Sequence, residues 1–172
     1  MLIKKLLRKF KRFFDFLIGD KSNEIYWRYK SFFSSDWRDG YLDSENEIHP
    51  HRKLLLKKII QTHSIDSILE VGCANGINLR MINKKIPGIT LEGFDINKKA
   101  LREGVNILKR ENITNIKLKH QSAKNLGSYD TGRFDVVFCD AVLMYIGPNN
   151  IKQSLKEMVR ISKKSVIICE QH

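Results

Sequence analysis

From Ser67 onward, short apolar runs alternate with amphipathic stretches along the chain. Runs rich in β-branched and aromatic residues predict five strands: Ser67–Val71, Thr90–Asp95, Ile116–His120, Phe134–Cys139 and Ser165–Cys169. Helical spacing predicts helices or turns between them: Gly76–Lys84, Lys98–Arg110, Ala123–Leu126 and Asn150–Ile161, the last capped by Asn149 or Asn150. Strands and helices that alternate in this way predict βαβ units and a mostly parallel sheet. The strands are almost continuously apolar, which is typical of a sheet covered by helices on both faces.

Residues 1–20 carry a different pattern, in which apolar side chains recur three or four residues apart beside a dense group of basic ones. The apolar positions are Leu2, Ile3, Leu6, Leu7, Phe10, Phe13, Phe14 and Leu17. This spacing predicts a basic amphipathic helix as an N-terminal extension. Such a helix either lies on an anionic membrane surface or packs on the protein or a partner, and the sequence leaves both interpretations open.

Residues 21–62 form a cap segment, whose first part is polar and aromatic and shows little periodicity. In this part Tyr26, Trp27 and Trp37 either cover a binding site or anchor the cap on the domain. Pro50 is tolerated in the first turn of a helix, so a first helix is expected over His51–Thr62. Residues 63–172 hold the alternating strands and helices of the main domain.

Composition indicates a single domain in a reducing compartment. A chain of 172 residues that is 42% hydrophobic can build one core but not two. Its three Cys residues form no C-x-x-C pair, so we expect neither a disulfide framework nor a metal site. A cytoplasmic location follows, peripheral on the inner face of the membrane if residues 1–20 bind lipid. No apolar run approaches the roughly 18 residues that span a bilayer.

The net charge of +12 favours anionic partners, among them nucleic acid, acidic lipid and phosphorylated substrates. The chain is also rich in Lys, Ile and Asn, which indicates a compositional bias as much as a binding surface. Nucleic acid is therefore not the favoured partner.

The carboxyl ends of the predicted strands are where a sheet of this kind binds ligands. The first strand runs into residues 70–76, Glu-Val-Gly-Cys-Ala-Asn-Gly, whose two glycines allow a tight turn against a ligand. A dinucleotide fingerprint needs glycine where Ala74 and Ile77 stand, so a pyrophosphate cradle is not expected. The second strand ends at Asp95, whose carboxylate either accepts both hydroxyls of a ribose or caps the next helix.

Together these motifs, E-x-G-x-x-x-G after the first strand and G-x-D after the second, resemble the class I S-adenosylmethionine-dependent methyltransferases over Ser67–Glu170. The resemblance implies a three-layer α/β sandwich with a mostly parallel, Rossmann-like sheet in the order 3-2-1-4-5. It also implies S-adenosylmethionine as the cofactor. The family's sheet usually adds two further strands as an antiparallel hairpin, so a C-terminally shortened fold is expected here.

The resemblance assigns donor-binding roles to a set of residues at the strand ends. They are Glu70, Gly72, Cys73, Asn75, Gly76, Asp95, Ile96, Ser122, Ala123 and Asp140. Glu70 would face the donor's amino group, Asp95 would bind the ribose hydroxyls, and Ile96 would pack on the adenine. Ser122 stands where the family usually has an acidic residue at the adenine edge. Asp140 would lie under the sulfonium.

The expected reaction is methyl transfer to a small-molecule or lipid-linked acceptor. An acceptor hydroxyl would need a base, for which His49 and His51 are the candidates. A surface loop that precedes a helix explains these two histidines equally well. Glu170 and His172, after the fifth strand, either reach the cleft or belong to a terminus.

Two alternatives to this enzyme remain open. In the first, the protein binds the donor without turnover, because a shortened sheet leaves the fifth strand as an edge; a second chain could supply the missing wall in an oligomer. In the second, which is less favoured, it methylates RNA. The loop Asp140–Tyr145 lacks the prolines typical of enzymes that methylate amino groups of bases.

Overall fold

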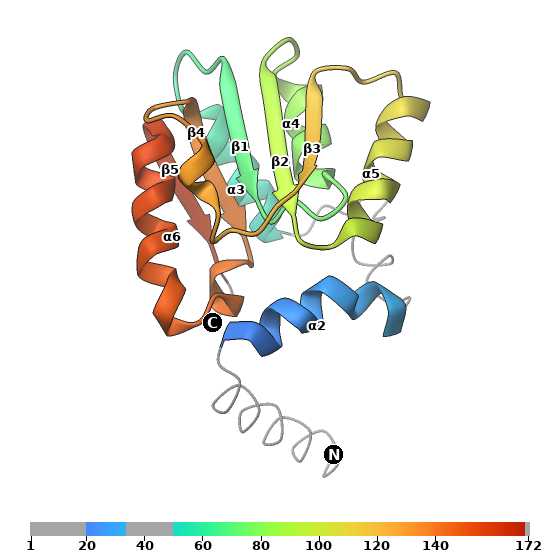
Figure 1. Ribbon diagram of the computed structural model, residues 1–172. Coiled ribbons are helices and arrows are strands. Elements are labelled where there is room, and N and C mark those ends of the chain that lie inside the picture. The colour runs from blue at the N-terminus through green and yellow to red at the C-terminus, as the bar shows by residue number, and fades with distance from the viewer. Residues whose placement is uncertain (1–19, 34–49, 171–172) are drawn as a thin grey trace.

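A parallel five-stranded sheet forms the centre of the computed structural model, which describes residues 20–33 and 50–170 (Figure 1). The strand order is β3-β2-β1-β4-β5, and every neighbouring pair is parallel. The strands are β1 (Ser67–Val71), β2 (Thr90–Asp95), β3 (Ile116–His120), β4 (Phe134–Asp140) and β5 (Ser162–Cys169). The predicted fold class and strand order are confirmed.

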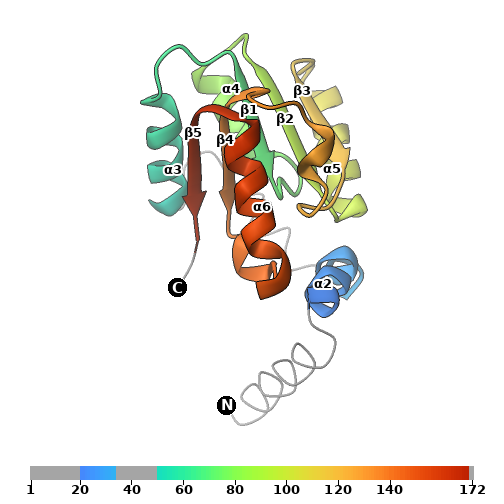
Figure 2. The same cartoon turned by 60° about the vertical axis from the view of Figure 1, so that its left-hand side comes forward.

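Helices cover both faces of the sheet, which explains the nearly continuous apolar strands. One face packs against α3 (Pro50–Ile60), α4 (Ile77–Lys85) and α5 (Lys98–Arg110). The other face packs against α6 (Pro148–Ile161) and the short 3-10 helices η1 (Leu126–Ser128) and η2 (Leu143–Tyr145). Figures 1 and 2 show α6 and α3 on opposite sides of the sheet.

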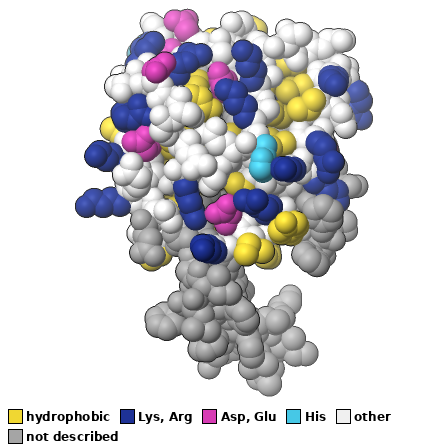
Figure 3. All heavy atoms as spheres, viewed as in Figure 1, with side chains coloured by type: hydrophobic (Ala, Val, Ile, Leu, Met, Phe, Trp, Pro, Cys, Tyr) yellow, Lys and Arg dark blue, Asp and Glu magenta, His cyan; other side chains and the backbone are white. Residues whose placement is uncertain are grey.

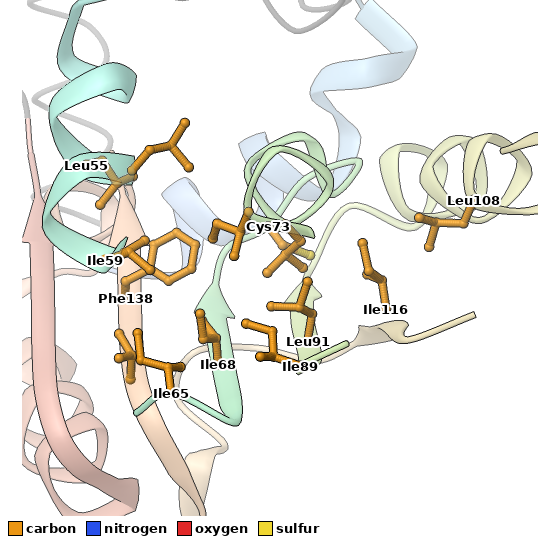
Figure 4. Packing of buried hydrophobic residues seen from close by; sticks show 14 of the residues in the cluster. Leu55, Ile59, Ile65, Ile68, Cys73, Ile89, Leu91, Leu108, Ile116 and Phe138 are labelled. Atoms are coloured by element: carbon orange, nitrogen blue, oxygen red, sulfur yellow. The ribbon is translucent and has the colours of Figure 1, made fainter. Parts of the chain in front are cut away.

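Two apolar clusters lie on either side of the central strands and form the core. Neighbouring residues of β1 serve opposite clusters, Ile68 toward α3 and α4 and Leu69 toward α6, as alternation along a strand requires. Figure 4 shows Phe138 of β4 against Ile59 of α3 in the first cluster. Each fully buried side chain of this size contributes roughly 1.5–3 kcal/mol.

The helix α2 (Asp20–Phe33) lies in the segment where the sequence shows little periodicity. It crosses beyond the carboxyl ends of the strands and contacts α5, α6 and η2 (Figure 1). Large side chains such as Ile25 and Tyr29 are about half exposed on it, and Asn23, Glu24 and Trp27 are only partly buried. Polar residues are among the partly buried ones and apolar residues among the exposed ones, so the sequence shows no clear hydrophobic repeat and the helix was not predicted.

Several predicted boundaries differ from those of the structure. α6 begins at Pro148 with Gly147 as its N-cap and no capping side chain, so the predicted cap at Asn149 or Asn150 is wrong. Proline fits the first turn because its missing N–H is not needed there. β5 begins at Ser162, directly after α6 and earlier than predicted.

The predicted amphipathic helix over residues 1–20 lies almost wholly outside the described residues. The division of residues 1–62 into a helix and a cap therefore stays a prediction. Within residues 20–33 and 50–170, no helix is both long enough and apolar enough to span a bilayer.

Candidate functional site

The turn after β1 is built on glycines with positive φ angles. Gly72 has φ 75° and Gly76 has φ 76°, a conformation that glycine adopts without the strain of a Cβ. The backbone N–H groups of Gly72 and Cys73 donate to the carbonyl of Phe94 at 2.9 and 3.0 Å. A Cβ on Gly72 would lie 2.3 Å from Cγ2 of Val142. The turn is therefore packed tightly between β2 and the loop after β4.

The Asp95 carboxylate joins this turn to the start of α5. Its Oδ2 accepts the backbone N–H of Ala74 at 2.9 Å, and its Oδ1 accepts that of Asn97 at 2.7 Å. Burial, opposed by these hydrogen bonds, raises the pKa of Asp95. The side chain that caps α5 is Asn97, which accepts from the N–H groups of Lys99 and Ala100. Asp95 is thus free of the capping role and lies on a pocket wall.

A pocket of about 950 Å³, part of it open to solvent, lies beyond the carboxyl ends of the strands. Six predicted site residues line it: Gly72, Asp95, Ile96, Ser122, Ala123 and Asp140. Its largely apolar wall with a few polar groups is typical of small-molecule sites.

The pocket is covered by α2, which contributes Asn23, Glu24 and Trp27 to its wall. The Trp27 ring meets the Tyr145 ring edge to face, with centroids 4.6 Å apart. An ion pair of 3.2 Å joins Glu24 to Lys124 on the loop after β3. Asn23 and Glu24 were not predicted, because no sequence signal places α2 over the site. Trp27 does line the pocket, whereas Trp37 lies outside the described residues.

A buried polar cluster lies beside the pocket, on the face of the sheet that α3 and α4 cover. Asn78 of α4 donates through Nδ2 to Glu70 Oε1 at 2.7 Å and to Asp140 Oδ2 at 3.3 Å. Burial raises the pKa of Glu70 to about 8. The hydrogen bond from Asn78 lowers this pKa, and the charge of Asp140 raises it. The Arg52 charge acts in the opposite direction.

Four predicted donor residues lie behind the pocket wall rather than on it. The Cys73 side chain is in the core, and burial raises the pKa of its thiol well above the usual range. Gly76 packs against Leu118. Glu70 Oε2 and Asn75 Oδ1 are buried, and neither accepts a hydrogen bond from a described residue. Such atoms mark a place where a ligand or water would complete the bonding.

Among the candidate bases, His51 lies beside the pocket. It does not line the pocket itself, but its Nε2 is 3.4 Å from Oδ1 of Asp140, which does. Glu170 does not enter the cleft, because its carboxylate accepts backbone N–H groups of the loop after β4. His49 and His172 lie outside the described residues.

A glycine turn after β1, an acidic residue ending β2 and a pocket at the strand ends are all features of the class I, Rossmann-like methyltransferases. Residues 68–165 match the methyltransferase domain family, which is more than half of the 172 residues. The chain belongs to this family, and the resemblance inferred from the two motifs is confirmed. S-adenosylmethionine, the cofactor predicted from the sequence, is the methyl donor of this class.

Solved structures share the fold at low sequence identity. A putative S-adenosylmethionine-dependent methyltransferase from Methanococcus maripaludis matches with a TM-score of 0.59 and 15% identity, over 73% of this chain and 66% of its own. The Pyrococcus horikoshii OT3 protein PH0226 matches with a TM-score of 0.61 and 20% identity, over 78% and 58%. PKMT2 from Rickettsia typhi, solved with AdoHcy, matches with a TM-score of 0.54 and 22% identity, over 67% and 23%.

One curated relative, the protein RP028 from Rickettsia prowazekii (strain Madrid E), is 31% identical over 80 residues. The match covers 46% of this chain and 31% of the relative. The chain thus matches about a third of that protein's length.

Proposed function

We propose that this protein is a methyltransferase that binds S-adenosylmethionine in the pocket under α2 and methylates a small-molecule or lipid-linked acceptor. The observation that supports this most directly is the Asp95 carboxylate on the pocket wall, fixed by the turn after β1 and followed by Ile96. A fixed carboxylate next to an apolar side chain suits a ribose and its base. When bound, S-adenosylmethionine supplies an activated methyl group on its sulfonium, so the protein's part is orientation and the exclusion of water.

The residues around the pocket fit the two ends of the donor. Asp95 would accept the ribose hydroxyls, with Ile96 and Ala123 against the adenine and Ser122 at its edge. At the other end, the buried oxygens of Glu70 and Asn75 would accept hydrogen bonds from the ammonium group, directly or through water. An ammonium group would also favour the ionised form of Glu70, which burial disfavours.

We infer that His51 is the general base if the acceptor is a hydroxyl. Asp140 would hold the ring through its 3.4 Å contact with Nε2 and stabilise the imidazolium that forms when the acceptor's proton arrives. Replacement of His51 by Gln should lower kcat by about 10²-fold or more while the affinity for the donor stays within about twofold. An equal loss of donor affinity and kcat would instead assign His51 to donor binding.

Calorimetry with S-adenosylhomocysteine tests the donor site. Asp95→Asn should weaken binding at least about tenfold, since one good hydrogen-bonded contact to a charged group is lost. Asp130→Asn, on an exposed residue away from the pocket, is the matched control. Unchanged binding in Asp95→Asn would refute the assignment.

Turnover needs its own measurement. The protein and labelled S-adenosylmethionine are incubated with membrane and soluble fractions of cells. The release of S-adenosylhomocysteine is compared with that from the same fractions without the protein. Release with a fraction supports the enzyme. Donor binding without release from either fraction would favour the alternative, a donor-binding protein without turnover.

A lipid-linked acceptor is supported by the exposed face of α2. Ile25, Tyr26 and Tyr29 are 55%, 47% and 48% exposed, and α2 follows directly on the basic segment 1–19. Apolar and aromatic side chains beside basic ones suit an anionic membrane surface. Flotation with phosphatidylserine vesicles should be lost when residues 1–19 are deleted and weakened in Ile25→Ser. Flotation that is unaffected by both changes would refute membrane contact through this end of the molecule.

A further inference from the structure

The loop after β4, residues 141–146, forms one wall of the donor pocket and is held by the end of β5. The backbone N–H of Ala141 donates to the Cys169 carbonyl at 2.7 Å. The next three N–H groups, those of Val142, Leu143 and Met144, all donate to the carboxylate of Glu170. Four consecutive N–H groups are therefore bonded to two consecutive residues, the last residue of β5 and the one that follows it.

The geometry of these bonds is that of a carboxylate at the start of a helical turn. Oε1 of Glu170 accepts from Val142 at 3.1 Å and from Leu143 at 2.9 Å, and Oε2 accepts from Met144 at 3.2 Å. The N-cap of η2, Val142, has an apolar side chain that cannot cap these groups. Glu170 supplies the acceptor that the local sequence lacks, and bonds to an ionised acceptor are stronger than neutral ones.

The same loop carries the side chains that shape the pocket. Val142, Tyr145 and Ile146 all line it. Val142 packs where a Cβ of Gly72 would stand, and Tyr145 meets Trp27 of α2. A shift of the loop would therefore disturb both the turn under the ligand and the helix above it.

We propose that Glu170 is a positioning residue of the donor site, which holds residues 142–145 so that Val142 and Tyr145 complete the pocket. The ligand's identity rests on the proposed function, whereas the contact between Glu170 and the loop does not. Glu170 lies outside residues 68–165, the part that matches the family, and its carboxylate acts through the loop backbone rather than on the ligand.

Two measurements on Glu170→Ala and Glu170→Gln test this role. Amide hydrogen exchange should accelerate at residues 142–144 and stay unchanged at Val136 to Phe138 inside β4. Affinity for S-adenosylhomocysteine should fall about tenfold in Glu170→Ala, and less in Glu170→Gln, which keeps one acceptor oxygen. Glu111→Ala, which removes an exposed carboxylate paired with Arg80, is the matched control and should change neither.

Three outcomes would overturn the proposal. The loop amides could exchange as in the wild type, which would show that Glu170 does not hold them. They could exchange faster without any loss of affinity for S-adenosylhomocysteine. Finally, β4 could exchange faster to the same extent as the loop, which would indicate a global loss of stability. If Glu170→Ala does not fold, Glu170→Gln decides between the same outcomes. A wild-type protein that fails to bind S-adenosylhomocysteine refutes the proposed function, while the exchange data still test the contact.

Discussion

Glu70 shows how the burial of one residue beside the pocket makes the stability of the protein depend on pH. Glu70 as a whole is 1% exposed. One of its carboxyl oxygens accepts a hydrogen bond from Asn78, and the other has no partner among the described residues. Burial, opposed by the bond from Asn78, raises its pKa from 4.5 to about 8. Between these two pH values the folded protein holds a proton that the unfolded chain releases, so the contribution of Glu70 to stability falls as pH rises.

Glu70→Gln should remove this pH dependence, because Gln resembles the protonated acid. Relative to the variant, the wild type should lose stability between pH 5 and pH 8, by at most about 4 kcal/mol at ~1.4 kcal/mol per pH unit. Urea unfolding of both proteins at several pH values measures the difference, with Glu111→Gln as the exposed control. A difference in stability that does not change with pH would contradict the raised pKa.

At the scale of elements, α2 covers the pocket that lies beyond the carboxyl ends of the strands. Among its described side chains, Glu24 forms an ion pair with Lys124 and Trp27 packs on Tyr145. Surface ion pairs contribute little, about 0–1 kcal/mol, so the aromatic contact is the stronger of these two.

Trp27→Ala should weaken the binding of S-adenosylhomocysteine about five- to tenfold, mainly through faster dissociation, because the cover over the pocket is lost. Stopped-flow displacement measures the dissociation rate. Tyr29→Ala is the matched control, since Tyr29 is a half-exposed aromatic residue on the same helix and does not line the pocket. Equal effects of the two substitutions would show that α2 contributes only general stability.

At the scale of the whole molecule, the edge of the sheet and the surface charge bear on partners. Within the described residues β5 pairs only with β4, and Ile168 near its end is 47% exposed. Lys163 and Lys164 at its start discourage pairing there, as edge lysines do. Figure 3 shows Lys and Arg side chains spread over one face among a few acidic ones, rather than gathered in a single stripe for RNA.

We predict that the second half of β5 mediates self-association. Sedimentation velocity should show a concentration-dependent oligomer for the wild type and a monomer for Ile168→Lys, because a charge at the edge opposes strand pairing. Val159→Lys is the control, since Val159 is also exposed but lies on α6. A wild type that stays monomeric at all concentrations would exclude this interface.

The sequence by itself determined the number of strands and their approximate places, and its two motifs carried the family resemblance that implied their order and the methyl donor. Apolar runs such as 134–139 must be buried on both faces, and the glycines of residues 70–76 followed by Asp95 restrict what can bind at the strand ends. These are local properties, set by side-chain type and spacing over a few residues. They suffice for a parallel sheet covered by helices on both faces, whereas the strand order was implied by the resemblance to the methyltransferase family.

Only the tertiary structure decided what surrounds the ligand. Three contacts join segments that are far apart in the chain. They are the packing of Trp27 on Tyr145, the contact of His51 with Asp140, and the hydrogen bonds from the loop after β4 to Glu170. The Glu170 carboxylate could serve as an acid, a base or a cap, and its neighbours in sequence do not distinguish these uses. The fold selects one of them by bringing unpaired N–H groups within reach, because buried donors must find acceptors.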